Sequence, residues 1–420
     1  MERPRLHALE SSPAYPGWRV LLGAVIGLAF SPGPMIFGSF GLFASYLQGD
    51  FGWGRGQIML GLTFFNVAGV LASPYTGAMI DRFGVRRILF PSLILFSAGF
   101  LAIGWLTHSL SAFYFVTFLW GALTIGTQSI SYTKLIAGWF VQRRGLAIGI
   151  AAAGLGLGYA IVPVMVGKLL TVTTWQIALT AMAALILLVP MLVNLLVAFP
   201  RPADPAAPPV SADGLSLGEA LRTAEFRIMG GAIFLASAAL TGVVPHIALM
   251  TLDRGFATAA AAMVASTYGI STILGRVLVG WLADRFPAPW VALLFFAISA
   301  IGFLLAALLG PMAPLILLIA VALTIGLGFG AESDIIALFI TRFFGQRSFG
   351  AIYGYLLAIF LIGASIGPAL FGFGRDAMGS YSVPMIIAAA IMLLACCLLA
   401  LLGRCPARVP APVSVGGAIA

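Results

Sequence analysis

Long apolar stretches separated by short polar turns run through almost the whole chain. About twelve of these stretches are roughly 20 residues long and carry few charges, and the strict alternation of a half-buried strand is absent. A bilayer-spanning helix needs about 20 apolar residues, and in hydrocarbon it satisfies its backbone hydrogen bonds within itself. The pattern therefore predicts an all-α membrane protein with twelve transmembrane helices. The expected spans are residues 19–46, 57–80, 87–107, 112–138, 144–168, 174–198, 226–250, 259–283, 289–309, 314–341, 349–373 and 382–402.

A polar, proline-rich stretch at residues 200–220 interrupts this pattern near the middle of the chain. Such a composition is typical of a flexible linker. Its end, residues 215–227, is polar enough to predict a short amphipathic helix at the membrane surface. The predicted organisation is a cytoplasmic N-terminus (1–18), a first six-helix half (19–199), a linker (200–225), a second six-helix half (226–403) and a disordered C-terminal tail (404–420).

The two halves share short sequence motifs at a nearly constant offset of about 203 residues. A multi-span unit that was duplicated in parallel normally moves as two halves around a site at the bilayer midplane. The repeat therefore favours a transporter-like arrangement of two six-helix halves. The matching segments are GAMIDRF at 77–83 with GWLADRF at 280–286, WFVQRR at 139–144 with FFGQR at 343–347, and GYAIVP at 158–163 with GASIGP at 363–368.

Composition and charge agree with a membrane protein. Hydrophobic residues make up 61% of the chain and charged residues 8%, against about 25% charged residues in soluble domains. The net charge of +9 comes from arginines in alternate loops, whereas Arg55, Lys168, Arg254 and Arg375 fall on the other side. This distribution argues against nucleic-acid binding, and the positive-inside rule places both termini in the cytoplasm.

The sequence offers no pattern for an enzyme, a metal site or a cofactor site. The chain's three cysteines, Cys396, Cys397 and Cys405, lie in or just after the last span and form no spaced metal motif. The glycine runs at 154–158 and 326–330 resemble dinucleotide loops, but both lie inside apolar helices. We expect these glycines to let helices pack closely.

The loop at 77–87, GAMIDRFGVRR, resembles the signature of the major facilitator superfamily, and the resemblance extends over about residues 17–403. The segments 139–149 and 275–285 are similar to motifs of the monocarboxylate transporter family, and 328–354 is similar to its bacterial members. The resemblance implies a secondary transporter of the bacterial inner membrane that acts by alternating access. It further implies a small organic anion as substrate, with a monocarboxylate as the expected class.

Arg276 is the first candidate for substrate binding. It lies on span 8, eight residues before Asp284, which is about 12 Å inside the boundary of the span. An intramembrane arginine is costly and usually faces a cavity, and its planar fork suits a carboxylate. The alternatives are a partner for an internal acid or an arginine that extends to the interface.

Polar or irregular positions near the middle of other spans are weaker candidates for the binding site. Gly33 belongs to the segment Ser31–Pro34, in which two prolines and a glycine predict a break in span 1. Such breaks line transporter cavities or are simple packing kinks. The other candidates are Asn66, Gln128, Tyr159 and Tyr353, each of which could instead form a hydrogen bond between helices.

Three titratable residues are candidates for proton coupling: Glu332, Asp334 and His246. The two acids lie deep in span 10 and differ by about 200° around the helix, so they cannot both face one cavity. Their alternative role is to brace a gate on the cytoplasmic side. His246 follows Pro245 in span 7 and could carry protons or make a structural hydrogen bond.

Charged residues at the repeated loops are candidates for gating, because charge pairs there could hold one face closed and release it as the halves move. They are Asp81, Arg82, Asp284, Arg285, Arg143 and Arg347.

Two features of the monocarboxylate transporter family are missing. The aspartate that the resemblance would place one turn before Arg276 is Thr272, and span 1 contains no lysine. The family's usual proton coupling is therefore not implied, and symport, antiport and uniport stay open. We expect a monomer, with the bilayer as its surroundings. The alternatives are a drug or cation exporter of the same fold, with Glu332 as the cavity acid, or a membrane sensor that does not transport.

Overall fold

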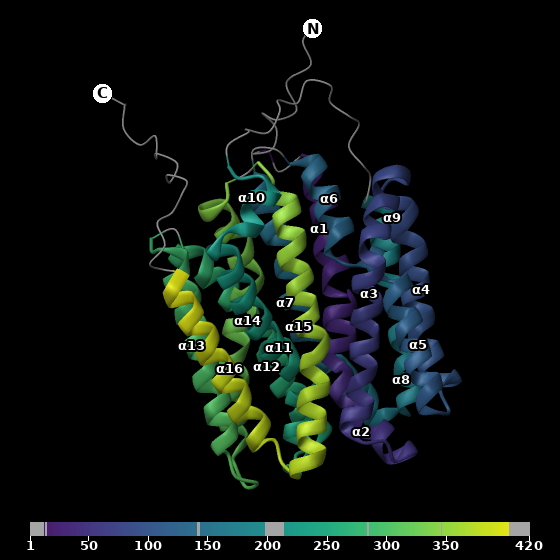
Figure 1. Ribbon diagram of the computed structural model, residues 1–420. Helices are drawn as coiled ribbons and strands as arrows, with labels where there is room; N and C mark the ends of the chain where they lie inside the picture. Colours follow the sequence, from purple (N-terminus) through teal and green to yellow (C-terminus); the bar gives the residue numbers. More distant parts are fainter. Residues whose placement is uncertain are drawn as a thin grey trace.

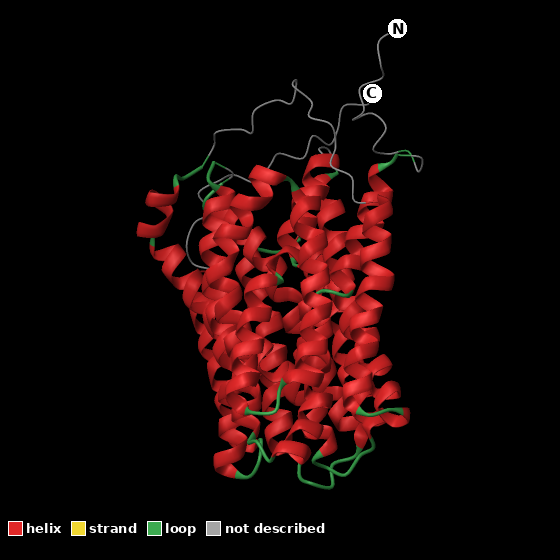
Figure 2. Ribbon diagram, turned by 90° about the vertical axis from the view of Figure 1, so that its right-hand side faces the viewer, coloured by secondary structure: helices red, strands yellow, loops and turns green. Residues whose placement is uncertain are grey.

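The computed structural model describes residue 12 and residues 15–140, 143–197, 214–283, 285–345 and 347–402. Helices and short loops make up this part of the chain, and no strand is drawn in it (Figure 2). Among the described residues, eleven helical segments are long and apolar enough to cross a membrane, and the shorter apolar helix Leu110–Leu123 joins a further helix to complete a twelfth. The predicted all-α membrane fold is confirmed.

The first half holds six spans, several of which consist of more than one helix (Figure 1). In chain order the helices are α1 (Gly17–Ala29), η2 (Gly33–Phe37), α2 (Gly38–Phe51), α3 (Arg55–Phe83), α4 (Val85–Leu106), α5 (Leu110–Leu123), η3 (Ile125–Thr127), α6 (Ser129–Trp139), α7 (Arg144–Val172), α8 (Trp175–Ile186), η4 (Leu187–Met191) and α9 (Leu192–Val197).

The second half begins with a short surface helix and holds six continuous spans (Figure 1). Its helices are α10 (Leu217–Arg222), α11 (Ala224–Leu252), α12 (Thr258–Ala283), α13 (Ala288–Leu308), α14 (Leu315–Phe343), α15 (Phe349–Met378) and α16 (Ser382–Leu402).

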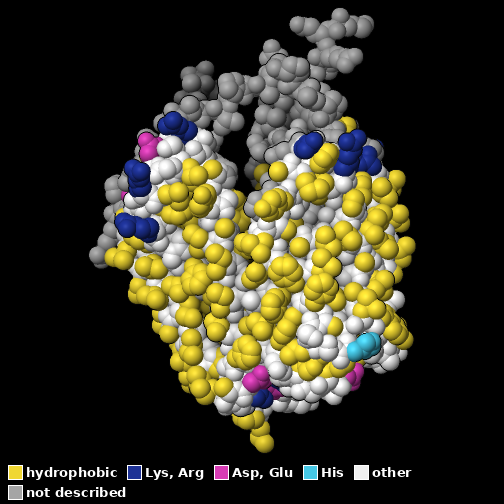
Figure 3. Space-filling view, turned by 45° about the vertical axis from the view of Figure 1, so that its right-hand side comes forward, with side chains coloured by type: hydrophobic (Ala, Val, Ile, Leu, Met, Phe, Trp, Pro, Cys, Tyr) yellow, Lys and Arg dark blue, Asp and Glu magenta, His cyan; other side chains and the backbone are white. Residues whose placement is uncertain are grey.

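The bundle has two ends, which we name by the segments they carry. The terminal face holds the start of α1 at Gly17 and the end of α16 at Leu402, and the distal face holds the turns at 52–54, 253–257 and 379–381 (Figure 1). Basic side chains gather at the terminal face in the view of Figure 3, where the surface is also hollowed between the two halves.

The predicted helix at 215–227 is divided in two. Ser216 accepts a hydrogen bond from the Glu219 amide and caps α10, and Thr223 accepts one from the Phe226 amide and caps α11. Since each N-cap residue leaves the helical backbone conformation, one helix cannot run through Thr223. Before α10, the Leu215 amide donates to the Phe344 carbonyl at 2.8 Å, which fastens the end of the linker to the second half.

Two spans of the first half are broken near their middle. Span 1 breaks between Ala29 and Gly33, where Pro32 and Pro34 lack amide hydrogens, as the sequence predicted. Span 4, expected to be continuous over 112–138, instead breaks between α5 and α6. Gln128 at this break has an extended backbone with φ −88° and ψ −178°.

The glycine runs hold helices in close contact, as expected. A Cβ built on Gly158 would lie 2.1 Å from the Ala29 carbonyl oxygen, and one on Gly330 would lie 2.1 Å from the Thr272 carbonyl oxygen. Real Cβ atoms do not approach backbone so closely, so only glycine permits α7 to pack on α1 and α14 to pack on α12.

The halves meet mainly through α3 with α15 and α7 with α12, and also where α2 packs on α11 and α12. At the distal end, Gly56 of α3 packs on Gly372 of α15, and further in the Asn66 side chain donates to the Ala364 carbonyl at 3.3 Å. The interface thus extends from the distal face about 16 Å inwards along α3.

Candidate functional site

The contact between α7 and α12 shows where the two halves separate. Gly269 of α12 lies against the Tyr159–Ala160 backbone, and Gly156 of α7 lies against Thr272 and Ile273. These contacts lie near the middle of both helices, and Gly167 of α7 lies against Ala262 of α12 nearer the distal face. Towards the terminal face, Figure 3 shows a hollow between the halves. The structure is therefore closed at the distal face and open towards the terminal face.

Arg276 lies one turn beyond Thr272, on the side towards the terminal face. Four residues along a helix correspond to about 6 Å. Thr272 itself is enclosed by Gly156 of α7 and Gly330 of α14, whereas Arg276 is half-buried. Arg276 therefore lies one turn from the tight packing of the halves, on the side of the terminal face.

Aromatic side chains adjoin this position and, with Arg276 and Gly33, form what we name the central cluster. Tyr159 of α7 stands edge-on to Phe329 of α14, with ring centroids 5.6 Å apart, and Tyr268 of α12 lies 5.5 Å from Phe329. Arg276 is close enough to Tyr159 for its charge to act on the hydroxyl. A Cβ on Gly33 would lie 3.1 Å from that hydroxyl, so the broken span 1 also reaches the cluster.

The central cluster thus unites three of the predicted substrate residues, Gly33, Tyr159 and Arg276, from both halves of the chain. Sequence reasoning missed Tyr268 and Phe329, because the sequence of an apolar span does not show whether an aromatic side chain faces lipid, the protein core or a cavity. The cluster combines one fixed positive charge with an apolar, aromatic wall. That combination suits a small anion with an apolar body.

The other three substrate candidates lie elsewhere. Asn66 makes the hydrogen bond to Ala364 described above, Gln128 is half-buried at the break in span 4, and Tyr353 is half-buried on α15. The hydrogen bond of Asn66 matches the alternative role that the sequence left open for it.

Glu332 is enclosed in the second half. Its side chain is 1% exposed, and neither carboxyl oxygen has a hydrogen-bond partner among the described residues. Tyr268 lies close enough for an electrostatic interaction between the two side chains. The side chain of Asp334 lies outside the described residues.

A polar network closes the distal face, and we name its members Arg55, Asp253, Arg375, Tyr381 and His246 the distal cluster. The guanidinium of Arg55, from the first half, donates through both terminal nitrogens to the Asp253 carboxylate of the second half, one of them at 2.6 Å. Arg55 also donates to the Tyr381 hydroxyl at 3.2 Å, and Arg375 Nε donates to Asp253 at 3.3 Å. One buried arginine thereby joins the two halves.

A second contact across the distal face lies beside this network. The Gly56 amide, in the first turn of α3, donates to the Asp376 carboxylate of α15 at 2.7 Å. An acidic group at a helix N-terminus also interacts favourably with the helix dipole. Both contacts join α3 to the second half.

The hydrogen bonds of His246 define its tautomer. Its side chain is fully buried; Nε2 lies 2.9 Å from the Pro368 carbonyl oxygen and Nδ1 lies 2.8 Å from the Tyr381 hydroxyl. A carbonyl can only accept, so Nε2 carries the hydrogen and the neutral ring accepts from Tyr381 at Nδ1. Both ring nitrogens have partners, which matches the structural alternative for His246.

Charge in the distal cluster is balanced around Asp253. Burial alone would raise the pKa of its carboxyl, but the hydrogen bonds and charges of Arg55 and Arg375 together hold that pKa below its ordinary value of 3.8. Burial also raises the pKa of the Tyr381 hydroxyl. Asp253 is therefore ionised and Tyr381 neutral near pH 7.

The described members of the predicted gating set belong to the terminal face. Arg82 lies over the Phe83 ring, and Arg285 donates to the Trp281 carbonyl at 2.8 Å. Arg143 precedes α7 and Arg347 is exposed after α14. Asp284 and the side chain of Asp81 lie outside the described residues, so the gating role stays a prediction.

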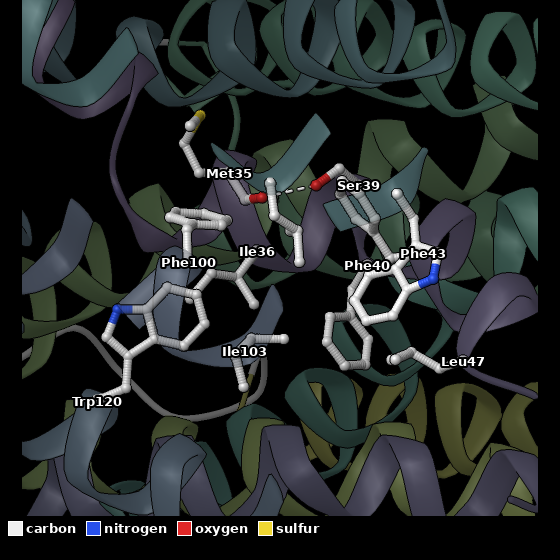
Figure 4. Close-up of a pocket in the computed structure, with 11 residues that line it drawn as sticks. Met35, Ile36, Ser39, Phe40, Phe43, Leu47, Phe100, Ile103 and Trp120 are labelled. Carbon is white, nitrogen blue, oxygen red and sulfur yellow. Dashed lines mark hydrogen bonds between the residues drawn. The ribbon is translucent and has the colours of Figure 1, made fainter. Parts of the chain in front are cut away.

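A separate cavity inside the first half is small and apolar. Its volume is about 20 Å³, and Phe40, Phe100 and Trp120 are among its lining residues (Figure 4). The Ser39 hydroxyl points to the Met35 carbonyl and donates to it at 2.6 Å. One water molecule needs about 10–15 Å³ of such space, so this cavity is too small for an organic substrate. Elsewhere in the described residues, no group of three His, Cys, Asp or Glu side chains could hold a metal ion.

The family profile described as Major Facilitator Superfamily matches residues 25–228 and again residues 229–418. The two matches cover nearly the whole chain and divide it where the repeat does. The chain belongs to the major facilitator superfamily. Its members are transporters, and this one is a multi-pass membrane protein for which the family implies a small-molecule substrate.

Within the superfamily, the chain is similar to monocarboxylate transporters. It is 28% identical to monocarboxylate transporter 11 of Homo sapiens over 77% of this chain and 69% of that protein. It is 29% identical to monocarboxylate transporter 13 of Bos taurus over 90% of this chain and 87% of that protein.

The fold matches solved structures of a bacterial homologue of the human lysosomal transporter Spinster. The inward-facing, unoccupied structure has a TM-score of 0.71 and 20% identity, covering 94% of this chain and 98% of the other. The inward-facing, occupied structure has a TM-score of 0.70 and 17% identity, covering 93% and 97%. At these identities the likeness shows the fold.

Proposed function

We propose that this protein is a secondary transporter that moves a small organic anion, a monocarboxylate, across a membrane by alternating access. The observation that carries the proposal is the place of Arg276, a half-buried arginine within a span, one turn from the contact between α7 and α12 on the side of the terminal face. Similarity to monocarboxylate transporters supports the same substrate class.

The chemistry of the central cluster supports a monocarboxylate. Arginine stays protonated within a membrane and binds a carboxylate through two parallel hydrogen bonds. Tyr159, Tyr268 and Phe329 make the surroundings of Arg276 apolar, and Phe329, which is half-buried, is the ring on which the rest of a small substrate could pack. A single positive charge next to apolar rings favours one carboxylate over two.

The distribution of contacts between the halves supports alternating access. The distal cluster and the glycine contacts of α12 close one side, while the other side is hollowed (Figure 3). In the opposite conformation the distal contacts would separate. Asp81, Arg82, Asp284, Arg285, Arg143 and Arg347 would then form the contacts that close the terminal face.

The orientation follows from charge. Basic side chains gather at the terminal face in the view of Figure 3, and the positive-inside rule assigns such a face to the cytoplasm. We therefore assign both termini to the cytoplasm and the present conformation to the inward-open state. As separate proposals, we assign the protein to a bacterial inner membrane, which follows from its resemblance to bacterial members of the family, and expect it to act as a monomer.

Ligand-dependent thermal stability tests the binding site. A ligand at 100 times its Kd stabilises a protein by about 2.7 kcal/mol, so a carboxylate panel with matched amides reveals which compounds bind. A hydrogen bond to a charged group contributes about 1.5–3 kcal/mol, so Arg276→Ala should weaken carboxylate binding by about 10- to 150-fold. Arg276→Lys should retain part of the affinity, because it keeps the charge and loses the bidentate geometry.

Arg222 supplies the matched control, since it is an exposed arginine on α10 outside the cluster. Arg222→Ala should bind carboxylates as the wild type does. Unchanged carboxylate affinity in Arg276→Ala would remove Arg276 from the site. Stabilisation by lipophilic cations and not by carboxylates would favour a cation exporter, and tight binding without flux into proteoliposomes would favour a sensor.

A further inference from the structure

The side chain of Arg55 is held from both halves, and its contacts divide unevenly between them. Among the described residues, Gln48 of α2 supplies its hydrogen bond within the first half, where Arg55 Nε donates to Gln48 Oε1 at 3.3 Å. The two terminal nitrogens instead donate to groups of the second half, the Asp253 carboxylate and the Tyr381 hydroxyl. Separation of the halves at the distal face therefore takes these acceptors away from the terminal nitrogens and leaves Nε on Gln48.

The helix start beside this guanidinium loses a carboxylate in the same movement. Arg55 is the first residue of α3, and the next amide, that of Gly56, donates to the Asp376 carboxylate of α15 at 2.7 Å. The positive end of the α3 dipole adds to the charge of the guanidinium at this point. In the closed structure, two carboxylates of the second half thus occupy neighbouring donor groups of the first half.

The nearby charged groups do not replace these carboxylates when the halves separate. Asp50, at the end of α2, already accepts a hydrogen bond from Trp175 Nε1 at 2.7 Å. Arg375 belongs to the second half together with Asp253, to which its Nε donates, so this pair stays together. A buried cation that loses its partner is strongly destabilised. An open distal face therefore favours binding of an anion from solution at Arg55.

We propose that Arg55 is an entry site for the carboxylate of the transported anion while the distal face is open, and that the anion and Asp253 compete for it. Gln48 orients the guanidinium through Nε, so the two terminal nitrogens are presented as a bidentate site for a carboxylate. Once the anion has moved on to Arg276, Asp253 returns to Arg55 and the distal face closes. The inference rests on the proposed function, because it takes the same anion as its ligand.

This competition makes binding at the entry site depend on conformation. Asp253 occupies the site in the closed form, so a carboxylate binds the open form and shifts the population towards it. The apparent affinity is the intrinsic affinity reduced by the fraction of molecules that are open. Loss of a hydrogen bond to a charged group in Asp253→Asn raises the ratio of open to closed molecules by about 30-fold. The half-saturating carboxylate concentration should then fall by about the same factor.

Thiol labelling of Ser365→Cys from the distal side measures this binding. Ser365 is 3% exposed at the contact between α3 and α15, so its replacement by cysteine lets an impermeant maleimide report opening. The native cysteines are replaced first, and Arg276→Ala removes the central cluster from the response. Acetate, propionate and benzoate, exchanged for chloride at constant ionic strength on the distal side, should accelerate labelling in a saturable way. Their neutral amides should leave the rate unchanged.

Three variants in this background identify the residue that binds the carboxylate. Asp253→Asn should lower the half-saturating concentration by about 30-fold, and Arg55→Gln should abolish the response to carboxylates. The matched control is Arg254→Gln, since the guanidinium of Arg254 lies at the same face but donates to three backbone carbonyl groups. Its response should equal that of the parent protein. If Arg55→Gln does not fold, Arg55→Lys replaces it and should raise the half-saturating concentration, because lysine lacks the fork.

A carboxylate response that persists in Arg55→Gln or is unchanged in Arg55→Lys would overturn the entry site. So would a half-saturating concentration that Asp253→Asn does not lower, or equal acceleration by acid and amide. Saturable carboxylate uptake by the wild type alongside any of these results would leave the proposed function in place without an entry site. A response that depends on Arg55, without carboxylate uptake into proteoliposomes, would refute the transport proposal and leave the distal anion site in place.

Discussion

Asp253 gives the sharpest test of how the distal face is held closed. It accepts both terminal nitrogens of Arg55 from the other half, and also Nε of Arg375. Asp253→Asn keeps the size of the side chain, removes its charge and leaves one acceptor oxygen. The distal face should then open more often.

The structure sets the size of this effect. A hydrogen bond to a charged group contributes about 1.5–3 kcal/mol, and the Asp253 side chain is 22% exposed, which places the loss at the lower end. A loss of about 2 kcal/mol shifts the equilibrium between closed and open distal faces by about 30-fold.

Thiol labelling from the distal side measures the shift. Ser365 of α15 is 3% exposed where Thr63 of α3 donates to its carbonyl, so Ser365→Cys reports opening of this interface. The three native cysteines must first be replaced. An impermeant maleimide added on the distal side should label Cys-substituted Ser365 about 30-fold faster when Asp253→Asn is also present.

Asp50 provides the matched control. It accepts a hydrogen bond from Trp175 Nε1 at 2.7 Å within the first half, so Asp50→Asn should leave the relation between the halves unchanged. Equal labelling rates in Asp253→Asn and the parent protein would refute the role of the Arg55–Asp253 pair. Equal acceleration by Asp50→Asn would mean that any loss of charge on this face has the same effect.

Two further predictions use the same labelling assay. Gly269→Ala should also speed labelling, by about tenfold, because its Cβ would lie 2.2 Å from the Ala160 amide nitrogen and overpacking costs about 1–3 kcal/mol. The control is Gly49→Ala, whose Cβ meets open space. Equal labelling rates in the two variants would contradict the close approach of α7 and α12. The pKa of Asp253 is lowered below 3.8, so its contribution to closure is complete above that value and is lost as pH falls through the folded pKa. Because a thiol reacts as its thiolate, labelling rates are compared between the parent protein and Asp253→Asn at each pH. The acceleration caused by Asp253→Asn should stay constant from about pH 8 to pH 5 and shrink below about pH 4, and a change already between about pH 8 and pH 5 would show that another group controls closure.

The fold could be predicted because the features that determine it are local features of the sequence. Apolar length defines each span, and the repeated loops show the duplication. The prolines at 32 and 34 explain the break in span 1, since they remove amide donors. The break in span 4 has no such signal, because no proline lies between Thr124 and Gln128. It depends on the packing of neighbouring helices, for example Gly126 against Ser92 of α4.

The candidate site was only partly predictable, because some of its residues are unusual within an apolar span and others are not. Arg276 stands out because a charge inside a span is rare, whereas Tyr268 and Phe329 look like any other apolar positions. The distal cluster was missed because its members come from separate turns, with Arg55 and Tyr381 326 positions apart. One signal could have found it: Arg55, Arg254 and Arg375 on the less basic side are matched by Asp50, Asp253 and Asp376 in the same turns.

The central claim is that Arg276 binds the carboxylate of a transported anion. Its most direct test is uptake of a radiolabelled monocarboxylate into proteoliposomes, compared with the neutral amide of the same shape. We expect saturable uptake of the carboxylate by the wild-type protein, little uptake of the amide, and loss of the difference in Arg276→Ala. Equal uptake of acid and amide by the wild type, or full carboxylate uptake by Arg276→Ala, would contradict the claim.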